Sequence, residues 1–239
     1  NAQCWYSISS GDQHTSAIKS DKTLWTWGRN NYGQLGDGTI INKDLPIQIG
    51  TDSNWQNVSL GGQHTVALKS DGTLWAWGRN NYGQLGDGTN INKNSPIQIG
   101  TNTNWKSISC GANYTIALKS DGTLWAWGYN GEGELGDGFN INRNSPIQIG
   151  SDSDWNSISA GWSHSTALKS DGTLWAWGYN AYGQLGDGTN LDKNTPTKIG
   201  LATNWLTISA GGDHTNAIKS NGTLWTCGYN YSGQLGDGT

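Results

Sequence analysis

The chain repeats one short pattern of apolar and polar positions. In Lys69 to Gly78, which reads Lys-Ser-Asp-Gly-Thr-Leu-Trp-Ala-Trp-Gly, the two tryptophans lie two residues apart, so both project from one face of a strand. Leu74 and Ala76 project from the other face. The preceding Asp71-Gly72 supplies residues that tolerate positive φ, as a two-residue hairpin turn requires. The stretch therefore predicts a strand, a tight turn and a second strand.

The same hairpin recurs five times, and equivalent tryptophans such as Trp55 and Trp105 stand 50 residues apart. In the second repeat we expect strands at 55–60, 64–69 and 73–77. A fourth strand, 96–100, reads as an edge strand because a proline at its start is tolerated there. No segment shows helical periodicity over three turns. The pattern predicts an all-β protein.

Four short antiparallel strands in each of five repeats predict a β-propeller. We expect a single β-propeller domain over residues 1–239, built from five four-stranded repeats of about 50 residues. The predicted repeats are 1–50, 51–100, 101–150, 151–200 and 201–239. Only four copies of the proline-containing strand are present, so one terminal blade should have three strands. The prolines are Pro46, Pro96, Pro146 and Pro196.

Tryptophan dominates the predicted packing between blades. A tryptophan-rich face that meets an alanine-rich face packs without voids, and each buried indole contributes a few kcal/mol. Fourteen of the fifteen tryptophans occupy positions that recur in each repeat, and we interpret them as structural. Those of the hairpins are Trp25, Trp27, Trp75, Trp77, Trp125, Trp127, Trp175, Trp177 and Trp225.

Each repeat also carries a longer recurrent text. Ile-Ser-Ala-Gly, then His-Ser or His-Thr, Ala-Leu, Gly-Thr-Leu-Trp-Ala-Trp-Gly and Gly-Gln-Leu-Gly-Asp-Gly-Thr follow one another in register along essentially the whole chain. This pattern closely resembles the regulator of chromosome condensation repeat. The resemblance implies a propeller, which has seven blades in the best known members, whereas five repeats are present here.

Two functions of that family can be compared with the residues. The exchange factors for the nuclear GTPase Ran act through a blade insertion, but the constant spacing of 50 leaves no insertion in any blade here. The plant ultraviolet-B photoreceptors use Gly-Trp-Arg-His-Thr pentads. Only Gly161-Trp-Ser-His-Ser165 approximates such a pentad, and it lacks the arginine. The residues therefore argue against light sensing and give nucleotide exchange little support.

Charge and composition exclude some classes of partner. Charged residues make up only 13% of the chain and the formal net charge is −4, so we expect no binding to nucleic acid and no attraction to an anionic membrane. No apolar run approaches the ~20 residues of a membrane-spanning helix, so no membrane insertion is expected. Near-identical, Asn-rich repeats favour recent duplication in a bacterium. A secreted or cell-surface location is favoured over a cytoplasmic one.

One position of the repeat holds histidine in four blades and tyrosine in the third. These side chains should stand one per blade, too far apart to share an ion at the ~2.1 Å bond lengths of zinc. Each imidazole is expected to hold its local turn by hydrogen bonding instead. The loop at this position is still the candidate binding loop. Its candidate residues are Trp162, His14, His64, Tyr114, His164 and His214.

Trp162 is the one tryptophan outside the recurrent positions. It falls in the turn between the first two strands of the fourth repeat. An exposed ring at that place would favour contact with a partner. The alternative is a loop residue that packs locally, and the sequence does not decide between the two.

The chain offers no recognisable catalytic or cofactor chemistry. The recurrent Asp-Gly pairs lack the alternating oxygen ligands and bidentate Glu of a calcium loop, so we assign them to turns. The Gly-rich loop lacks the Gly-Lys-Ser/Thr of a phosphate cradle. Every acid or histidine with a fixed place in the repeat is copied, whereas an active site is usually a single departure from repetition. We expect no enzyme, no cofactor and no metal.

Three cysteines show no metal-type spacing. Cys110 occupies the position of a small core residue. Cys227 replaces the second tryptophan of the last hairpin, and Cys4 lies just before the first predicted strand. We hypothesise that the first and fifth blades meet, and a closing disulfide between Cys4 and Cys227, which needs Cα atoms within ~7 Å, is a minor alternative within that hypothesis. A three-stranded terminal blade also leaves an edge that invites self-association.

The favoured function is non-catalytic binding or scaffolding of a protein partner. Strand-end loops would present five near-identical surfaces, which suits a symmetric or multivalent partner. The alternative is a multivalent, lectin-like module that binds a glycan by stacking aromatic rings on sugars beside Asn, Asp and Gln side chains. A guanine-nucleotide exchange factor is the third and weakest alternative.

Overall fold

The computed structural model describes residues 4–239, so the first three residues of the first predicted repeat lie outside the described part of the chain. The described residues form nineteen β-strands and no helix, and therefore none that could span a membrane. The strands make four sheets of four and one sheet of three. This architecture confirms the predicted all-β propeller with a three-stranded terminal blade.

Within each blade, consecutive strands pair antiparallel in chain order. The first two blades contain β1 (Trp5–Ser10), β2 (His14–Lys19), β3 (Leu24–Gly28), β4 (Lys43–Gln48), β5 (Trp55–Leu60), β6 (His64–Lys69), β7 (Leu74–Gly78) and β8 (Lys93–Gln98). The third and fourth contain β9 (Trp105–Cys110), β10 (Tyr114–Lys119), β11 (Leu124–Gly128), β12 (Arg143–Gln148), β13 (Trp155–Ala160), β14 (His164–Lys169), β15 (Leu174–Gly178) and β16 (Lys193–Lys198). The fifth contains β17 (Trp205–Ala210), β18 (His214–Lys219) and β19 (Leu224–Gly228).

The hairpin turns have the geometry that the sequence predicts. Gly72, Gly122 and Gly172 all adopt positive φ, and a Cβ on Gly72 would lie 2.0 Å from the carbonyl oxygen of Thr103 in the next blade. Lys22 fills the same position in the first blade with φ 66°, the one positive φ outside glycine among the described residues. Glycine is therefore favoured at this position by φ and, in the second to fourth blades, by the close approach of the next blade.

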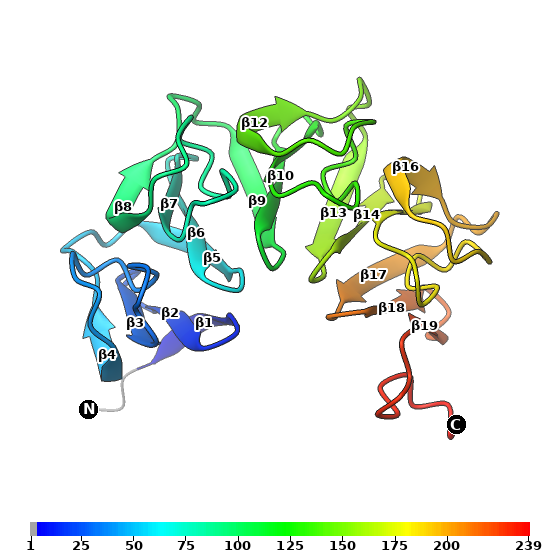
Figure 1. Ribbon diagram of the computed structural model, residues 1–239, viewed down its shortest axis with the longest axis horizontal. Coiled ribbons are helices and arrows are strands. Elements are labelled where there is room, and N and C mark those ends of the chain that lie inside the picture. The colour runs from blue at the N-terminus through cyan, green and yellow to red at the C-terminus, as the bar shows by residue number, and fades with distance from the viewer. Residues whose placement is uncertain (1–3) are drawn as a thin grey trace.

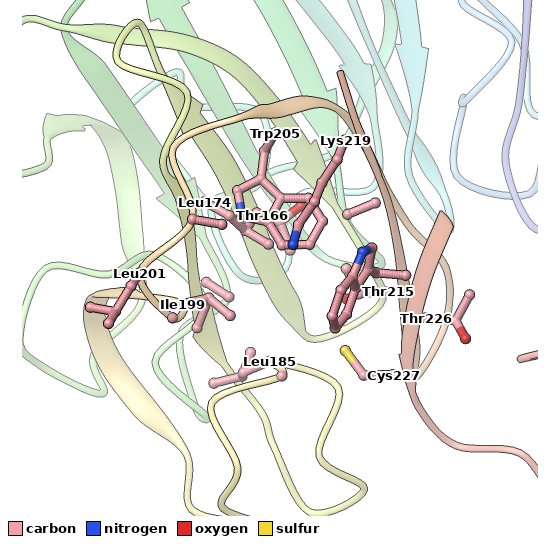
Figure 2. A pocket seen from close by; sticks show the side chains of 16 residues that line it. Thr166, Leu174, Leu185, Ile199, Leu201, Trp205, Thr215, Lys219, Thr226 and Cys227 are labelled. Carbon is pink, nitrogen blue, oxygen red and sulfur yellow. The ribbon is translucent and has the colours of Figure 1, made fainter. Parts of the chain in front are cut away.

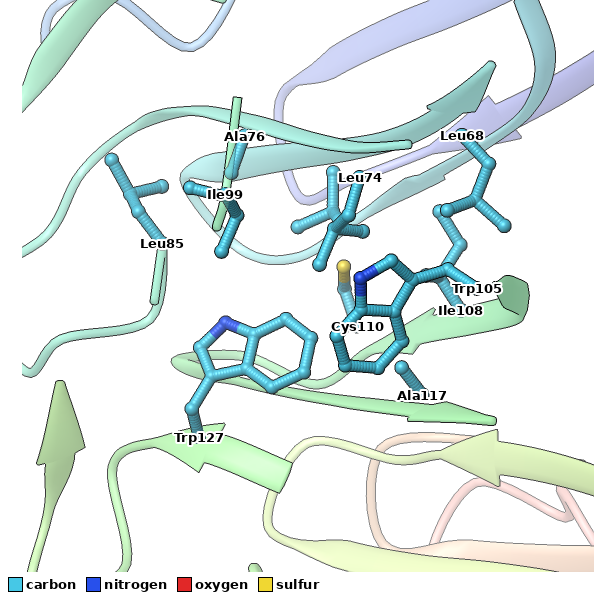
Figure 3. Packing of buried hydrophobic residues seen from close by; sticks show 11 residues of the cluster. Leu68, Leu74, Ala76, Leu85, Ile99, Trp105, Ile108, Cys110, Ala117 and Trp127 are labelled. Atoms are coloured by element: carbon cyan, nitrogen blue, oxygen red, sulfur yellow. The ribbon is translucent and has the colours of Figure 1, made fainter. Parts of the chain in front are cut away.

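The first three of the four interfaces between blades bury tryptophan, as the sequence predicts. At the interface between the second and third blades, Trp105 and Trp127 pack with Cys110 against Leu74 and Leu85 (Figure 3). Trp127 is completely buried, and its Nε1 donates to the carbonyl of Gln84 at 3.0 Å. Cys110 is a buried core residue, as expected. The hydrogen bond fixes the depth of the indole, and the apolar walls supply most of the stabilisation.

The first tryptophan of each hairpin is only partly buried and holds a lysine. The ammonium of Lys69 lies 3.9 Å from the ring centre of Trp75 and 4.8 Å from that of Trp55. The same Nζ forms a 2.7 Å ion pair with Asp52. These cation–π contacts recur in all five blades, which explains why Lys is copied at this position although it is nearly buried.

The blades form an open arc, and the hypothesis that the first and fifth blades meet is wrong. Figure 1 shows these blades at the two ends of the arc, with β5, β9 and β13 along its inner side. Ile8 is 68% exposed on the first blade and Leu224 is 63% exposed on the fifth, whereas the counterparts Val58 and Ile108 of Ile8, and Leu74 and Leu124 of Leu224, are buried. Cys227 carries a free thiol, so the disulfide with Cys4 is not formed. The rotation from one blade to the next, repeated over five blades, falls short of a full circle.

Candidate interaction face

The turn between the first two strands and the long loop after the third emerge at the same end of each blade. His14 pairs with Gly28, so the backbone N–H of Arg29 reaches the carbonyl of Gln13 at 2.8 Å. The same bond recurs in the other four blades. We call the surface made by these turns and loops the interaction face. Its turns are 11–13, 61–63, 111–113, 161–163 and 211–213, and its loops start at 29, 79, 129, 179 and 229.

The turns surround a shallow polar hollow of about 250 Å³ at the centre of the arc, bordered by all five blades. Backbone hydrogen bonds link neighbouring turns. The N–H of Gly62 donates to Ala112 O at 3.0 Å, the N–H of Ala112 to Trp162 O at 3.2 Å, and the N–H of Trp162 to Gly212 O at 3.2 Å. The turns are thus held as one rim, with side chains projecting from a fixed backbone.

Trp162 projects from this rim with 57% of its side chain exposed. The glycine at 212 lies against the ring, since a Cβ built there would be 3.5 Å from the indole. The ring is therefore an exposed aromatic surface and not part of the core. The sequence left open whether Trp162 is exposed or packs locally in its loop, and in the structure it is exposed.

The histidines of the candidate binding loop lie beneath the interaction face. His64 Nε2 is 3.1 Å from Thr115 Oγ1 of the next blade, and the hydroxyl of Thr115 donates in turn to the carbonyl of Gln84. The imidazole must then be the donor, so it is the neutral Nε2–H tautomer. Burial lowers the pKa of His64 to about 3, which keeps it neutral. The expected local bond is thus corrected: the imidazole joins two blades.

Two other histidines of this set also form a hydrogen bond to the next blade. His14 and His164 bond to the threonines of the next blades, Thr65 and Thr215, at 3.0 and 2.9 Å. Burial also lowers the pKa of each of these imidazoles to about 4.

Tyr114, which replaces histidine in the third blade, is likewise buried and donates to His164 O. His214, in the last blade, is partly buried. The described residues contain no group of three or more potential metal ligands. These residues position the turns, and Trp162 alone in the set is exposed.

A row of tyrosines and arginines borders the rim, and the sequence analysis missed it. The ring centres of Tyr82 and Tyr129 are 5.1 Å apart, and those of Tyr182 and Tyr229 are 4.8 Å apart. The guanidinium of Arg79 lies 5.2 Å from the ring centre of Tyr32. Members of the row come from every blade. They are Arg29, Tyr32, Arg79, Tyr82, Tyr129, Tyr179, Tyr182, Tyr229 and Tyr231.

The row has a signal in the sequence. The position after the third strand reads Arg, Arg, Tyr, Tyr, Tyr along the five blades, while the glycine before it and the asparagine after it never change. A position that departs from repetition between two copied ones is a surface position free to vary. Comparing the repeats column by column would have found it.

Glu134 is a further departure within the third blade. The equivalent residue is glutamine in the other four blades, and its backbone carbonyl receives the bond from the indole of Trp177 at 2.8 Å. The carboxylate accepts the N–H of Glu132 at 3.0 Å through Oε2, while Oε1 has no hydrogen-bond partner among the described residues. Burial raises the pKa of Glu134 to about 7.

Blades built from this repeat define a β-propeller whose one face carries a fixed rim and variable side chains. The family model described as "Regulator of chromosome condensation (RCC1) repeat" matches residues 21–68, 71–118, 121–168 and 171–218, and a second model of the same description matches 5–34, 55–84, 105–134, 155–184 and 206–234. The chain belongs to this repeat family, as its resemblance implies.

Individual relatives match more narrowly. The ultraviolet-B receptor UVR8 of Arabidopsis thaliana is 43% identical over 42 residues, which are 18% of this chain and 10% of the receptor. The human E3 ubiquitin-protein ligase HERC2 is 38% identical over 42 residues, 18% of this chain and 1% of the ligase. The matched segment is thus about one repeat long in each relative.

Two solved structures match almost the whole chain. Human WBSCR16 is 25% identical with a TM-score of 0.82, and the match covers 92% of this chain and 59% of that one. Prp20p of Saccharomyces cerevisiae is 25% identical with a TM-score of 0.84 and coverage of 98% and 60%. The chain therefore spans about 60% of the length of these propellers.

Proposed function

We propose that the chain is a non-catalytic binding or scaffolding propeller that docks a protein partner on its interaction face. The observation that carries the proposal is the gathering of exposed and partly exposed Trp, Tyr and Arg side chains on that one face. Trp162 stands at the central rim, and the tyrosine and arginine row lies beside it. These three residue types are the ones enriched at the energetic centres of protein interfaces.

The variation between blades supports a partner that sees an asymmetric surface. Buried positions of the strands are nearly identical in each blade, whereas the second turn position reads Asp12, Gly62, Ala112, Trp162 and Gly212, of which Asp12 and Trp162 are exposed. The sequence predicts five near-identical surfaces and therefore a symmetric or multivalent partner. The side chains at this position of the interaction face differ, which favours one partner in one orientation. The solved structure of Prp20p is described together with its binding to Gsp1p and histones, which supports a protein as the class of partner.

The test is affinity capture from a bacterial lysate with three baits: the wild type, Trp162→Ala and Leu201→Ala. Leu201 is the matched control, because it is 94% exposed and lies in the 199–204 loop at the opposite end of the blades. Each protein captured by the wild type is purified and titrated against the three baits by calorimetry. We expect Trp162→Ala to weaken binding at least tenfold, as loss of a central aromatic anchor does, and Leu201→Ala to leave it unchanged. Equal affinity for all three baits would contradict the proposal.

Two further assays separate the alternatives. A glycan array tests the lectin-like function, since exposed rings beside Asn and Gln side chains also suit sugars. Saturable glycan binding that Trp162→Ala abolishes would show that the ligand of this face is a sugar and not a protein. Accelerated release of labelled GDP from Ran would instead show exchange-factor activity. We expect neither result.

A further inference from the structure

Cys227 interrupts the packing rule of the interfaces between blades. In the three preceding interfaces the equivalent residues Trp77, Trp127 and Trp177 are completely buried. Each indole N–H donates to the backbone carbonyl of residue 34, 84 or 134 in the previous blade, at 3.0, 3.0 and 2.8 Å. At the fourth interface the thiol of Cys227 lies 3.4 Å from the equivalent carbonyl, that of Gln184. A side chain of two non-hydrogen atoms thus occupies the place of an indole.

A cavity of about 390 Å³ lies between the fourth and fifth blades, and Cys227 lines it. The equivalent hollows at the two preceding interfaces, where the indole is present, measure about 350 and 320 Å³ and have no residue of the 27, 77, 127 and 177 series in their walls. The walls of the cavity at Cys227 include Leu174, Ala176, Leu185 and Ile199 (Figure 2). Their counterparts one blade earlier are the residues that pack around Trp177: Leu124, Ala126, Leu135 and Ile149. The walls of an indole site are therefore preserved while the indole is absent. Apolar cavities of ~150 Å³ already bind benzene, and ligand pockets start at about 300 Å³.

Two polar groups at this cavity have weaker partners than some of their counterparts in other blades: the carbonyl of Gln184, which is bonded to the lining thiol of Cys227, and the ammonium of Lys219. Gln184 O accepts from Thr215 Oγ1 at 2.8 Å, but its second donor is only a thiol, which is a weak one. Lys219 also lines the cavity and forms no ion pair among the described residues. Ala202 stands where Asp52 and Asp152 pair with the equivalent lysines, Lys69 and Lys169.

We propose that this cavity is a binding site for a small planar aromatic molecule with a ring N–H and a carboxylate arm, of the indole-acid class. The ring fills the space between Leu174, Leu185 and Ile199, its N–H donates to Gln184 O, and its carboxylate faces the ammonium of Lys219. Burial raises the pKa of the Cys227 thiol to about 11, so the thiol stays protonated and binding is non-covalent.

The test is isothermal titration of the intact chain with indole-3-acetate, indole and 1-methylindole-3-acetate. We expect saturable binding of indole-3-acetate at one site. The 1-methyl analogue, which cannot donate to Gln184 O, should bind about threefold to tenfold more weakly, the usual range for one neutral hydrogen bond. Indole, which has no carboxylate for Lys219, should also bind more weakly, and Lys219→Gln should remove that difference.

Cys227→Trp is the decisive variant. It restores the side chain that four other blades carry, so the protein should fold with a raised melting temperature and lose all binding. Cys227→Ala keeps the cavity open and should bind indole-3-acetate as the wild type does. Absence of binding to the wild type would overturn the proposal. Undiminished binding to Cys227→Trp would overturn it equally, because the ligand would then lie elsewhere.

Discussion

Replacing the buried carboxyl at Glu134 by glutamine should stabilise the protein only at neutral and alkaline pH. The other four blades place glutamine here, where Oε1 of Gln34 accepts the N–H of Tyr32 at 2.9 Å. Glu134 accepts the equivalent hydrogen bond from the N–H of Glu132 through Oε2. Its carboxyl group is completely buried, and Oε1 lacks a partner among the described residues. Glu134→Gln keeps the shape and removes the ionisation.

The sign follows from proton linkage. Burial raises the pKa of Glu134 from its ordinary value of 4.5 to about 7, so the folded state binds this proton more tightly than the unfolded state does. Tighter binding of this proton stabilises the folded state. This contribution to the free energy of unfolding is fully present below about pH 4.5 and is lost as the pH rises through 7. The rise in pKa corresponds to an upper value of about 3 kcal/mol above pH 7.

Guanidinium unfolding of the wild type and Glu134→Gln, from pH 4.5 to pH 8.5, measures this directly. We expect equal free energies of unfolding at pH 4.5 and a growing advantage for the variant, up to about 3 kcal/mol, by pH 8.5. The mirror variant Gln84→Glu should lose a similar amount over the same range. A difference that does not change with pH would refute the reasoning, since it would show that Glu134 is not ionising in a buried site.

Three further predictions follow from single contacts. Trp127→Ala should lower the free energy of unfolding by ~3–5 kcal/mol, and a loss below about 1 kcal/mol would contradict its burial. Lys22→Gly should raise the free energy of unfolding by up to about 1 kcal/mol, because relief of the positive φ outweighs the lost contact of the Lys22 ammonium over the Tyr6 ring; an unchanged or lower denaturation midpoint would contradict this. Self-association through the open edge of β19 should appear as concentration-dependent sedimentation that Thr226→Pro abolishes, since proline blocks strand pairing; sedimentation as a monomer at all concentrations would contradict it.

The strands and the interface cores could be predicted from the sequence because both depend on local alternation. Trp75 and Trp77 lie on one face because they are two residues apart in a single strand. The same spacing in other repeats supports the same prediction. Closure of the arc could not be predicted in this way. It depends on the rotation between neighbouring blades, which is a sum of small packing angles that no residue encodes alone.

At the candidate site, too, local features could be predicted from the sequence and contacts between blades could not. The sequence correctly placed His64 at the start of its strand, but the expected local hydrogen bond was wrong, because the partner, Thr115, lies in the next blade, 51 residues away. Exposure of Trp162 depends on the glycine at 212 in the next blade, which leaves the ring uncovered. Both outcomes depend on which position of one blade faces which position of its neighbour, and that register appears only once the blades are stacked.

Departures from repetition are informative here because the repeat supplies its own reference. A tryptophan at 227 or a glutamine at 134 would complete a packing arrangement that the chain builds several times elsewhere. Cys227 instead lines a cavity, and Glu134 places a carboxyl group with a raised pKa in a buried site. Each such residue departs from one that packs well at the same position of the other blades. The cavity at Cys227, the carboxyl at Glu134 and the exposed ring of Trp162 are therefore the places where selection for binding, and not for packing, is to be sought first.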